Sequence, residues 1–173
     1  VIISKNGWVR VRQGHDIDPA TLTYKAGDAA GWIVPSRTVW PLVIIDSNGR
    51  SYSLKVADLP SGRGDGTPLN TLLDFQDGGK LAHVISGLPE DKYLVASSGA
   101  YGFITRIADM MSRNKAGKVF LTLEKGERPL TPAKVGASET ADTADTADTA
   151  HQMVAVLSEG GRLLMFALTE LKE

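Results

Sequence analysis

The feature that most limits how this chain can fold is an internal repeat. Four segments share one pattern, in which an apolar strand leads into a polar turn with glycine and then into an alternating strand. The turn glycines are Gly7, Gly49, Gly102 and Gly161. Asn-Gly and Gly-Gly turns between such strands are hairpin signals, and units of about 40 to 50 residues are typical of propeller blades. The sequence therefore predicts an all-β, propeller-like fold of about four blades, which must stack because one blade cannot bury both of its faces.

Two further signals follow the hairpins. The first is an acid before an apolar residue, at Asp16-Ile17, Asp58-Leu59, Asp109-Met110 and Glu170-Leu171. The acid lies nine residues after the turn glycine in three repeats, and seven residues after it in the third. The second is a basic loop with glycine, at Lys25-Ala26-Gly27, Arg63-Gly64 and Lys115-Ala116-Gly117. Glycine lets the main chain approach a ligand, and cations displace the counterions of a phosphate backbone. The recurrence predicts nucleic-acid contacts, although a generic polar turn is the alternative for any single loop.

Residues 137–150 form an insert between the third and fourth repeats. It consists of Thr-Ala-Asp triplets without a large apolar residue, so we expect a flexible acidic loop within one domain that spans residues 1–173. The net charge of the chain is −1. Because the insert holds Glu139, Asp142, Asp145 and Asp148, the remainder carries about +3, which is compatible with weak, salt-sensitive DNA binding.

Several classes of protein are excluded or disfavoured. The absence of cysteine excludes disulfide scaffolds, zinc fingers and cysteine nucleophiles. His15, His83 and His151 are too scattered for a metal-binding motif, and no nucleophile elbow is present. No apolar run approaches the roughly 20 residues of a membrane span. We therefore predict no catalytic residue, metal or cofactor in this chain, which starts inside a strand-like run and is expected to be a fragment of a longer protein.

Aromatic residues recur in the hairpin strands, at Trp8, Tyr52, Phe103 and Phe166. Packing between blades is the favoured role for them. Stacking on bases is the alternative, because aromatic rings bind single-stranded nucleic acid in this way.

The segment from Gly14 to Asp28 closely resembles part of the C-terminal domain found in one protein family, the A subunits of bacterial DNA topoisomerase IV. The segments 45–54, 101–104, 114–118 and 161–166 extend the resemblance over essentially the whole chain except the insert. The C-terminal domain of the related A subunit of DNA gyrase is the alternative.

The resemblance implies a β-pinwheel, a propeller-like disc whose blades exchange strands, here open or incomplete. It implies a non-catalytic domain that binds and bends duplex DNA on a basic rim and helps to select or present the transported segment during decatenation and supercoil relaxation. The parent would be an ATP-dependent type II topoisomerase that uses ATP and Mg²⁺ elsewhere. Its partners would be the B subunit of topoisomerase IV and the catalytic core of its own polypeptide, in the bacterial cytoplasm at the nucleoid.

One departure from the relatives limits the expected affinity. The gyrase domain carries a box rich in glutamine, arginine and glycine that this sequence lacks, which argues against strong wrapping of DNA.

A propeller-like protein-interaction module is the alternative to a DNA-binding function. The candidate DNA contacts, chosen because they recur in hairpins and loops, are Arg10, Arg12, Lys25, Arg50, Arg63, Arg106, Arg113, Lys115, Lys118 and Arg162.

Overall fold

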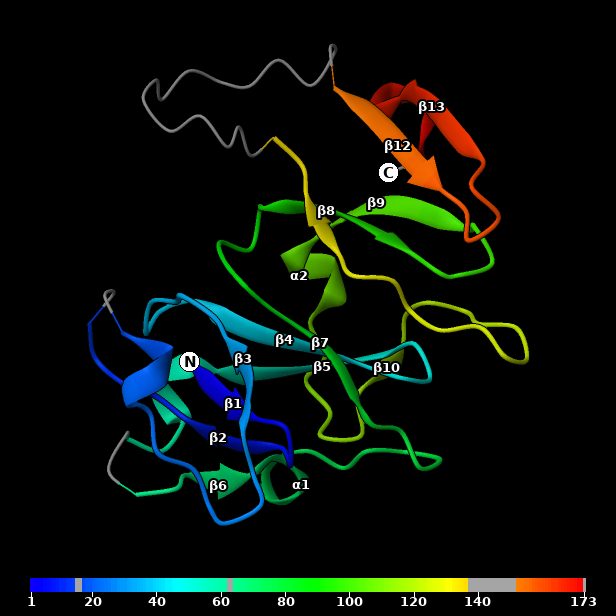
Figure 1. The fold of residues 1–173 in the computed structure, drawn as a ribbon. Helices are drawn as coiled ribbons and strands as arrows, with labels where there is room; N and C mark the ends of the chain where they lie inside the picture. Colours follow the sequence, from blue (N-terminus) through cyan, green and yellow to red (C-terminus); the bar gives the residue numbers. More distant parts are fainter. Residues whose placement is uncertain (15–16, 62–63, 137–151, 173) are drawn as a thin grey trace.

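The fold is a succession of small antiparallel sheets, in agreement with the all-β prediction. The computed structural model describes residues 1–14, 17–61, 64–136 and 152–172. In Figure 1 the sheets follow one another in chain order, from the blue hairpin near the bottom to the red hairpin at the top. No sheet within these residues closes into a barrel.

The strands are short, and the helices are single turns. The strands are β1 (Ile2–Ser4), β2 (Trp8–Arg10), β3 (Ala30–Ile33), β4 (Pro41–Asp46), β5 (Arg50–Lys55), β6 (Thr67–Pro68), β7 (Leu81–Ser86), β8 (Lys92–Ala96), β9 (Gly102–Arg106), β10 (Lys118–Val119), β11 (Ala133–Lys134), β12 (Met153–Leu157) and β13 (Leu163–Ala167). The α-helices are α1 (Leu69–Leu72) and α2 (Ile107–Met110), and the 3₁₀ turns are η1 (Pro19–Thr21), η2 (Val56–Asp58) and η4 (Leu168–Glu170). Among the described residues, no helix is long and apolar enough to cross a membrane.

Four hairpins are present, but the third turns at a different residue from the one predicted. The amides of Gly7, Gly49 and Gly161 close the other turns by donating to the carbonyl three residues earlier. In the third hairpin this bond is made by Ala100, whose φ is 65°, whereas Gly102 is the first residue of β9. The assignment of Gly102 as the turn residue was therefore wrong. Counted from Ala100, the acid Asp109 also lies nine residues after the turn, so all four repeats share one spacing.

Replacing Ala100 by glycine is expected to stabilise the chain by about 1 kcal/mol, because alanine is strained at positive φ and glycine is not. Urea unfolding measures the change. The matched control is Ala96→Gly in the neighbouring strand β8, which is expected to destabilise by about 0.5–1 kcal/mol because glycine weakens a strand. An Ala100→Gly variant that is destabilised as much as Ala96→Gly would contradict the corrected turn.

The blades are joined by strand exchange. The hairpin β1–β2 is completed by β3 and by β6, although β6 follows the second hairpin in the chain. The hairpin β4–β5 is completed by β7 and by β10, which follows the third hairpin. The third sheet, β8, β9 and β11, begins the same arrangement, because the Ile104 amide donates to the carbonyl of Lys172 after the fourth hairpin. Each of these hairpins is thus closed by main chain from the next repeat.

The position of strand β4 explains why the residues on both of its faces are apolar. All six of its residues are buried. Leu42 and Ile44 belong to a core cluster shared with the first hairpin, while Val43 and Ile45 belong to a cluster shared with the third. Because alternate residues of a strand point to opposite faces, β4 is packed between its two neighbours, as stacked blades require.

A buried carboxylate organises the second hairpin. The Oδ1 of Asp46 accepts from the amides of Asn48 and Arg50, and its Oδ2 accepts from the hydroxyl of Tyr52 at 2.9 Å. Burial raises the pKa of Tyr52 above its ordinary value, and its ring packs against Phe75 with centroids 4.9 Å apart. Tyr52 is therefore a core residue, which confirms the packing role predicted for it.

Candidate nucleic-acid interface

The loop before β10 is docked on the second hairpin. The Ser53 hydroxyl donates to the Ser112 carbonyl at 2.6 Å at one end of the loop, and Lys118 pairs with Ser51 of β5 at the other. The Asp74 amide donates to the Lys115 carbonyl at 2.9 Å. Within the loop, the amides of residues 116 and 117 donate hydrogen bonds to the side chain and the main-chain carbonyl of Asn114, so they do not point toward a ligand. The amides of these two residues are therefore engaged within the loop, while the side chains of Arg113 and Lys115 are exposed.

Three exposed cations come together beside this loop. Lys55, Arg113 and Lys115 line one groove of about 860 Å³, together with the acid Asp58. Lys55 was not among the predicted contacts, since it ends a hairpin strand and belongs to no basic loop. The docking of the third repeat on the second brings Lys55 to the same groove as Arg113 and Lys115. The apolar residues of the groove are Val39, Trp40, Pro41, Leu54, Ala57, Leu72, Leu73, Pro89 and Met111.

Two other predicted contacts lie around the acid Asp109. The Arg106 guanidinium donates to both carboxylate oxygens, at 2.9 and 3.3 Å. The Lys118 ammonium donates to the main-chain carbonyl of Asp109 at 2.5 Å. The hydrogen bond from Arg106 lowers the pKa of Asp109 below its ordinary value. Both cations therefore face a neighbouring acid, which reduces the positive potential that they present.

Arg10 and Arg50 are engaged with carbonyl oxygens. Arg10 is 6% exposed and donates to Gly64 O at 2.7 Å and Thr23 O at 2.6 Å. Arg50 is half-buried and donates to Ala116 O through Nε at 3.3 Å and Nη2 at 2.9 Å. Because Arg10 is buried, it is not part of the surface that DNA would meet. We therefore correct its predicted role from a DNA contact to a structural residue that links two loops through hydrogen bonds.

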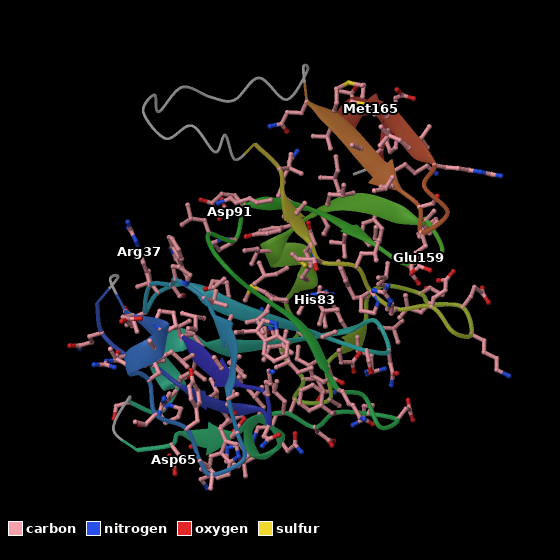
Figure 2. All side chains as sticks on the ribbon, in the orientation of Figure 1. Arg37, Asp65, His83, Asp91, Glu159 and Met165 are labelled. Carbon is pink, nitrogen blue, oxygen red and sulfur yellow. The ribbon has the colours of Figure 1, made fainter. Side chains whose placement is uncertain are left out.

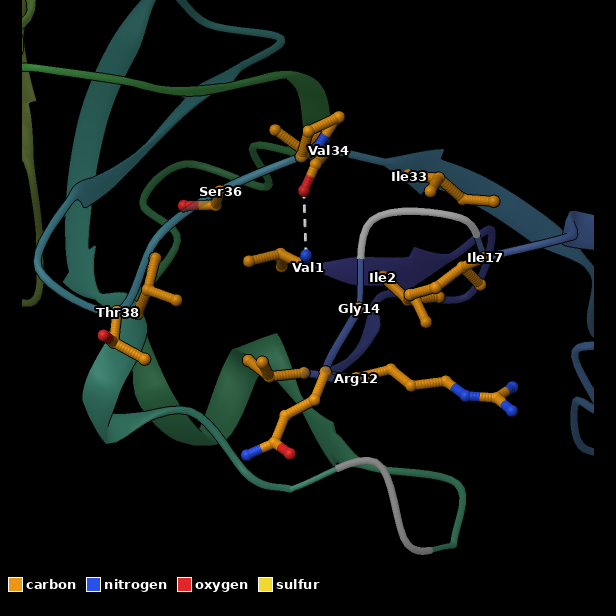
Figure 3. Close-up of a pocket in the computed structure, with 13 residues that line it drawn as sticks. Val1, Ile2, Arg12, Gly14, Ile17, Ile33, Val34, Ser36 and Thr38 are labelled. Carbon is orange, nitrogen blue, oxygen red and sulfur yellow. Dashed lines mark hydrogen bonds between the residues drawn. The ribbon is translucent and has the colours of Figure 1, made fainter.

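The remaining candidates are dispersed. Arg12 is exposed, and in Figure 3 its guanidinium extends away from the pocket where the amino group of Val1 donates to Val34 O. The Lys25 ammonium lies over the Trp8 ring, 3.4 Å from its centroid, which places the Trp8 ring in a cation–π contact. Arg162 is exposed in the turn of the fourth hairpin. Arg63, also predicted, lies outside the described residues, as does the insert 137–150.

The three basic loops that the sequence grouped together are of two kinds. The glycines Gly66 and Gly117 each precede an exchanged strand, β6 and β10. Lys25-Ala26-Gly27 instead belongs to the turn before β3, which pairs with its own hairpin. Its counterparts in the main-chain hydrogen bonding are residues 76–78 and 124–126, where the amides of Gly79 and Glu127 close the same turn. The grouping of Lys25 with the other two loops was wrong, because charge recurred there without equivalent structure.

The one histidine that the structure describes is hydrogen-bonded within the fold. His83 Nε2 lies 3.1 Å from the carbonyl oxygen of Pro129, and Figure 2 places this side chain near the middle of the molecule. His15 and His151 lie outside the described residues. Among the side chains that the structure describes, no group of three or more His, Asp or Glu is arranged to hold a metal ion.

No family model matches the chain, but proteins of one kind are similar to it over its whole length. It is 38% identical to the A subunit of DNA topoisomerase 4 from Neisseria gonorrhoeae, over 99% of the chain and 22% of that protein. It is 39% identical to the same protein of Pseudomonas aeruginosa, over 100% of the chain and 22% of that protein, and 35% identical to that of Escherichia coli K12, over 100% and 21%. The chain thus spans about a fifth of the length of these relatives.

Solved structures show the same likeness in three dimensions. The E. coli ParC C-terminal domain superposes with a TM-score of 0.88 at 35% identity, over 99% of the chain and 65% of that domain. A C-terminal domain of DNA topoisomerase IV and one of DNA gyrase A give TM-scores of 0.70 and 0.64, each at 13% identity, over 98% and 99% of the chain and 51% and 55% of those domains. Together with the exchanged strands, these matches confirm the predicted β-pinwheel.

Proposed function

Because the chain belongs to the family of DNA topoisomerase IV A subunits, as part of their C-terminal region, we propose that it binds duplex DNA for a type II topoisomerase. In this proposal it contacts and bends DNA through exposed cations, without itself cleaving it. It thereby helps to select or present the segment that the enzyme transports during decatenation and relaxation.

The observation that carries this proposal is the cation group of Lys55, Arg113 and Lys115 at one groove. These side chains come from two repeats, all are exposed, and Asp58 is the acid among the described residues that line the groove. Three exposed cations at one groove present phosphates with a concentrated positive charge, and each phosphate contact releases counterions from the duplex. The groove supplies a local contact, which fits a chain whose overall charge is close to zero.

The surroundings of the other cations support modest affinity rather than strong wrapping. Arg10 is buried, and Arg106 and Lys118 bond to Asp109. The glutamine-arginine-glycine box of the gyrase domain is absent from the sequence. The domain is therefore suited to brief, local contacts with DNA.

The test is a fluorescence anisotropy titration of the chain against labelled duplex DNA at several salt concentrations. If the three groove cations contact phosphates, log Kobs is expected to fall against log salt with a slope of about −2.7, or about 0.9 per contact. Binding to two duplexes of unrelated sequence is expected to be equal, because phosphate contacts carry no sequence information. No binding at low salt, or binding that salt does not weaken, would contradict the proposal.

The longer enzyme supplies the remaining proposals. We infer that its partners are the catalytic core of the same polypeptide and the B subunit of topoisomerase IV, that ATP and Mg²⁺ act in those parts, and that the enzyme works at the bacterial nucleoid. The resemblance of the chain to the A subunits of topoisomerase IV supports these points. Reconstitution of the full enzyme with and without the residues of this chain, followed by a decatenation assay, tests them.

A protein-interaction module is the second candidate. The observation that favours it is an apolar surface on β12 and β13, where Met153, Leu157 and Leu163 are 56%, 72% and 61% exposed. Figure 2 shows Met165 on the same sheet. Exposed apolar patches of this kind mark contacts with other protein surfaces. Absence of DNA binding in the titration above would favour this candidate.

A further inference from the structure

The side chain of Arg50 connects the second hairpin to the loop that carries Arg113 and Lys115. Its Nε and Nη2 donate to Ala116 O at 3.3 and 2.9 Å, and Nη2 also approaches Gly117 O at 3.4 Å. Guanidinium presents its N–H groups in a rigid fork, and hydrogen bonds from an ionised donor are stronger than neutral ones. The fork therefore holds two successive carbonyl groups of the loop in one place.

The preceding blade junction is held by an arginine too. Arg10 donates to Gly64 O, in the loop before β6, and to Thr23 O. The two arginines are not equivalent in the repeat, because Arg10 lies three residues after Gly7 and Arg50 one residue after Gly49. Both nevertheless reach carbonyl oxygens of the loop that precedes an exchanged strand. Two different hairpin positions thus provide the same contact, which indicates that the contact itself is what the junction needs.

The turn of the loop lies between its two fixed ends, where the Asp74 amide also donates to the Lys115 carbonyl at 2.9 Å. Residues 114–117 form a compact turn of their own, in which the Ala116 amide donates to Asn114 Oδ1 at 3.0 Å and the Gly117 amide to Asn114 O at 2.9 Å. Ser53 fixes the loop at Ser112, and the β10–β5 ladder fixes it from Lys118 onward. Between these two points, the Arg50 side chain bonds to the carbonyl groups of the turn.

We infer that Arg50 is a positioning residue, which fixes the turn so that Arg113 and Lys115 lie beside Lys55 at the groove. Its own charge is directed at carbonyl groups and is not one of the phosphate contacts, in contrast to the role that the sequence predicted for it. The consequence for DNA binding rests on the proposed function, whereas the consequence for the order of the loop does not.

The first test measures the loop without DNA, by amide hydrogen exchange on the full 173-residue chain. Arg50→Lys keeps the charge but loses the fork, and Arg50→Met loses both. Both variants are expected to speed exchange of the Ala116 and Gly117 amides by about tenfold to 100-fold, the range for losing one hydrogen bond from a charged donor. The β4–β5 amides are expected to stay protected. Unchanged loop exchange, or equal loss of protection throughout the hairpin, would overturn the inference.

The second test is a double-mutant cycle in the DNA titration. In the otherwise unchanged chain, Arg50→Lys is expected to weaken binding about threefold to tenfold although no charge is lost, because two cations lose their placement. In the background of Arg113→Gln with Lys115→Gln, the same change is expected to have no further effect. A direct phosphate contact would give the opposite result: Arg50→Lys would retain affinity, and Arg50→Met would lower the salt slope by about 0.9 in both backgrounds. If the unchanged chain binds no DNA, the proposed function fails, and the exchange experiment still decides the role of Arg50.

Discussion

Replacing Arg113 and Lys115 together by glutamine is expected to weaken binding of duplex DNA about 50-fold near 0.1 M salt, because each lost phosphate contact removes about 0.9 from the salt slope. The two slopes are therefore expected to differ by about 1.8. Both side chains are exposed at the groove, so thermal unfolding is expected to be unchanged. The anisotropy titration that tests the proposed function measures this effect.

The matched control removes two other exposed cations, Lys80 and Lys125. Each lies in a turn that also holds acids, since Asp77 precedes Lys80 and Glu124 precedes Lys125. The control changes the net charge by the same amount and is expected to alter affinity by less than about threefold, because neither side chain lines the groove and salt weakens interactions with more distant charges. Equal losses in the two double variants would mean that binding follows total charge and not the groove.

Replacing Gly49 by alanine is expected to lower the free energy of unfolding by about 4 kcal/mol, an unusually large effect for a single change. Gly49 has a φ of 78°, which costs about 1–2 kcal/mol for any residue with a Cβ. In addition, the new Cβ would collide with the carbonyl oxygen of Leu121, in the chain that follows β10. Gly49 O accepts from the amides of Phe120 and Leu121, so the collision falls on the exchanged segment itself. Urea unfolding, followed by circular dichroism, measures the loss.

Gly7 provides the matched control for Gly49. It holds the same position in the first hairpin and has a φ of 79°, but no heavy atom of the described residues lies within 4 Å of a Cβ built on it. Gly7→Ala is therefore expected to cost only the conformational term of about 1–2 kcal/mol. If the two substitutions destabilise the chain equally, the third repeat does not hold the Leu121 carbonyl against Gly49 closely enough to exclude a Cβ.

The hairpins were predictable from the sequence because their signals are local. A turn glycine between two alternating strands identifies each hairpin without knowledge of its neighbours, and three of the four turns lie where this pattern predicts. The third was misplaced because Ala100 adopts the left-handed conformation that glycine takes elsewhere, while Gly102 lies two residues away. A spacing of nine residues to the following acid is the signal that would have identified Ala100.

The site was predictable only in its loop. Arg113 and Lys115 were proposed as contacts because they lie in or beside a basic loop with glycine. Lys55 was missed, because it lies far from them in the chain and only strand exchange brings it to the same groove. Charge alone also cannot distinguish an arginine that faces solvent from one such as Arg10, whose N–H groups bond to carbonyl oxygens inside the fold. The direct DNA contacts thus stay a prediction that the titrations decide.

Strand exchange also determines how the blades would carry a mechanical load. A DNA segment held by Arg113 and Lys115 would pull on a stretch that is covalently part of the third repeat and hydrogen-bonded, through β10, to β5 of the second. Strain applied at that loop is shared between two adjacent sheets, and the pairing of β6 with β2 passes part of it to the first. Each of these blades is thus linked to the next by an exchanged strand. A pull on that loop would therefore act on the second and third sheets together.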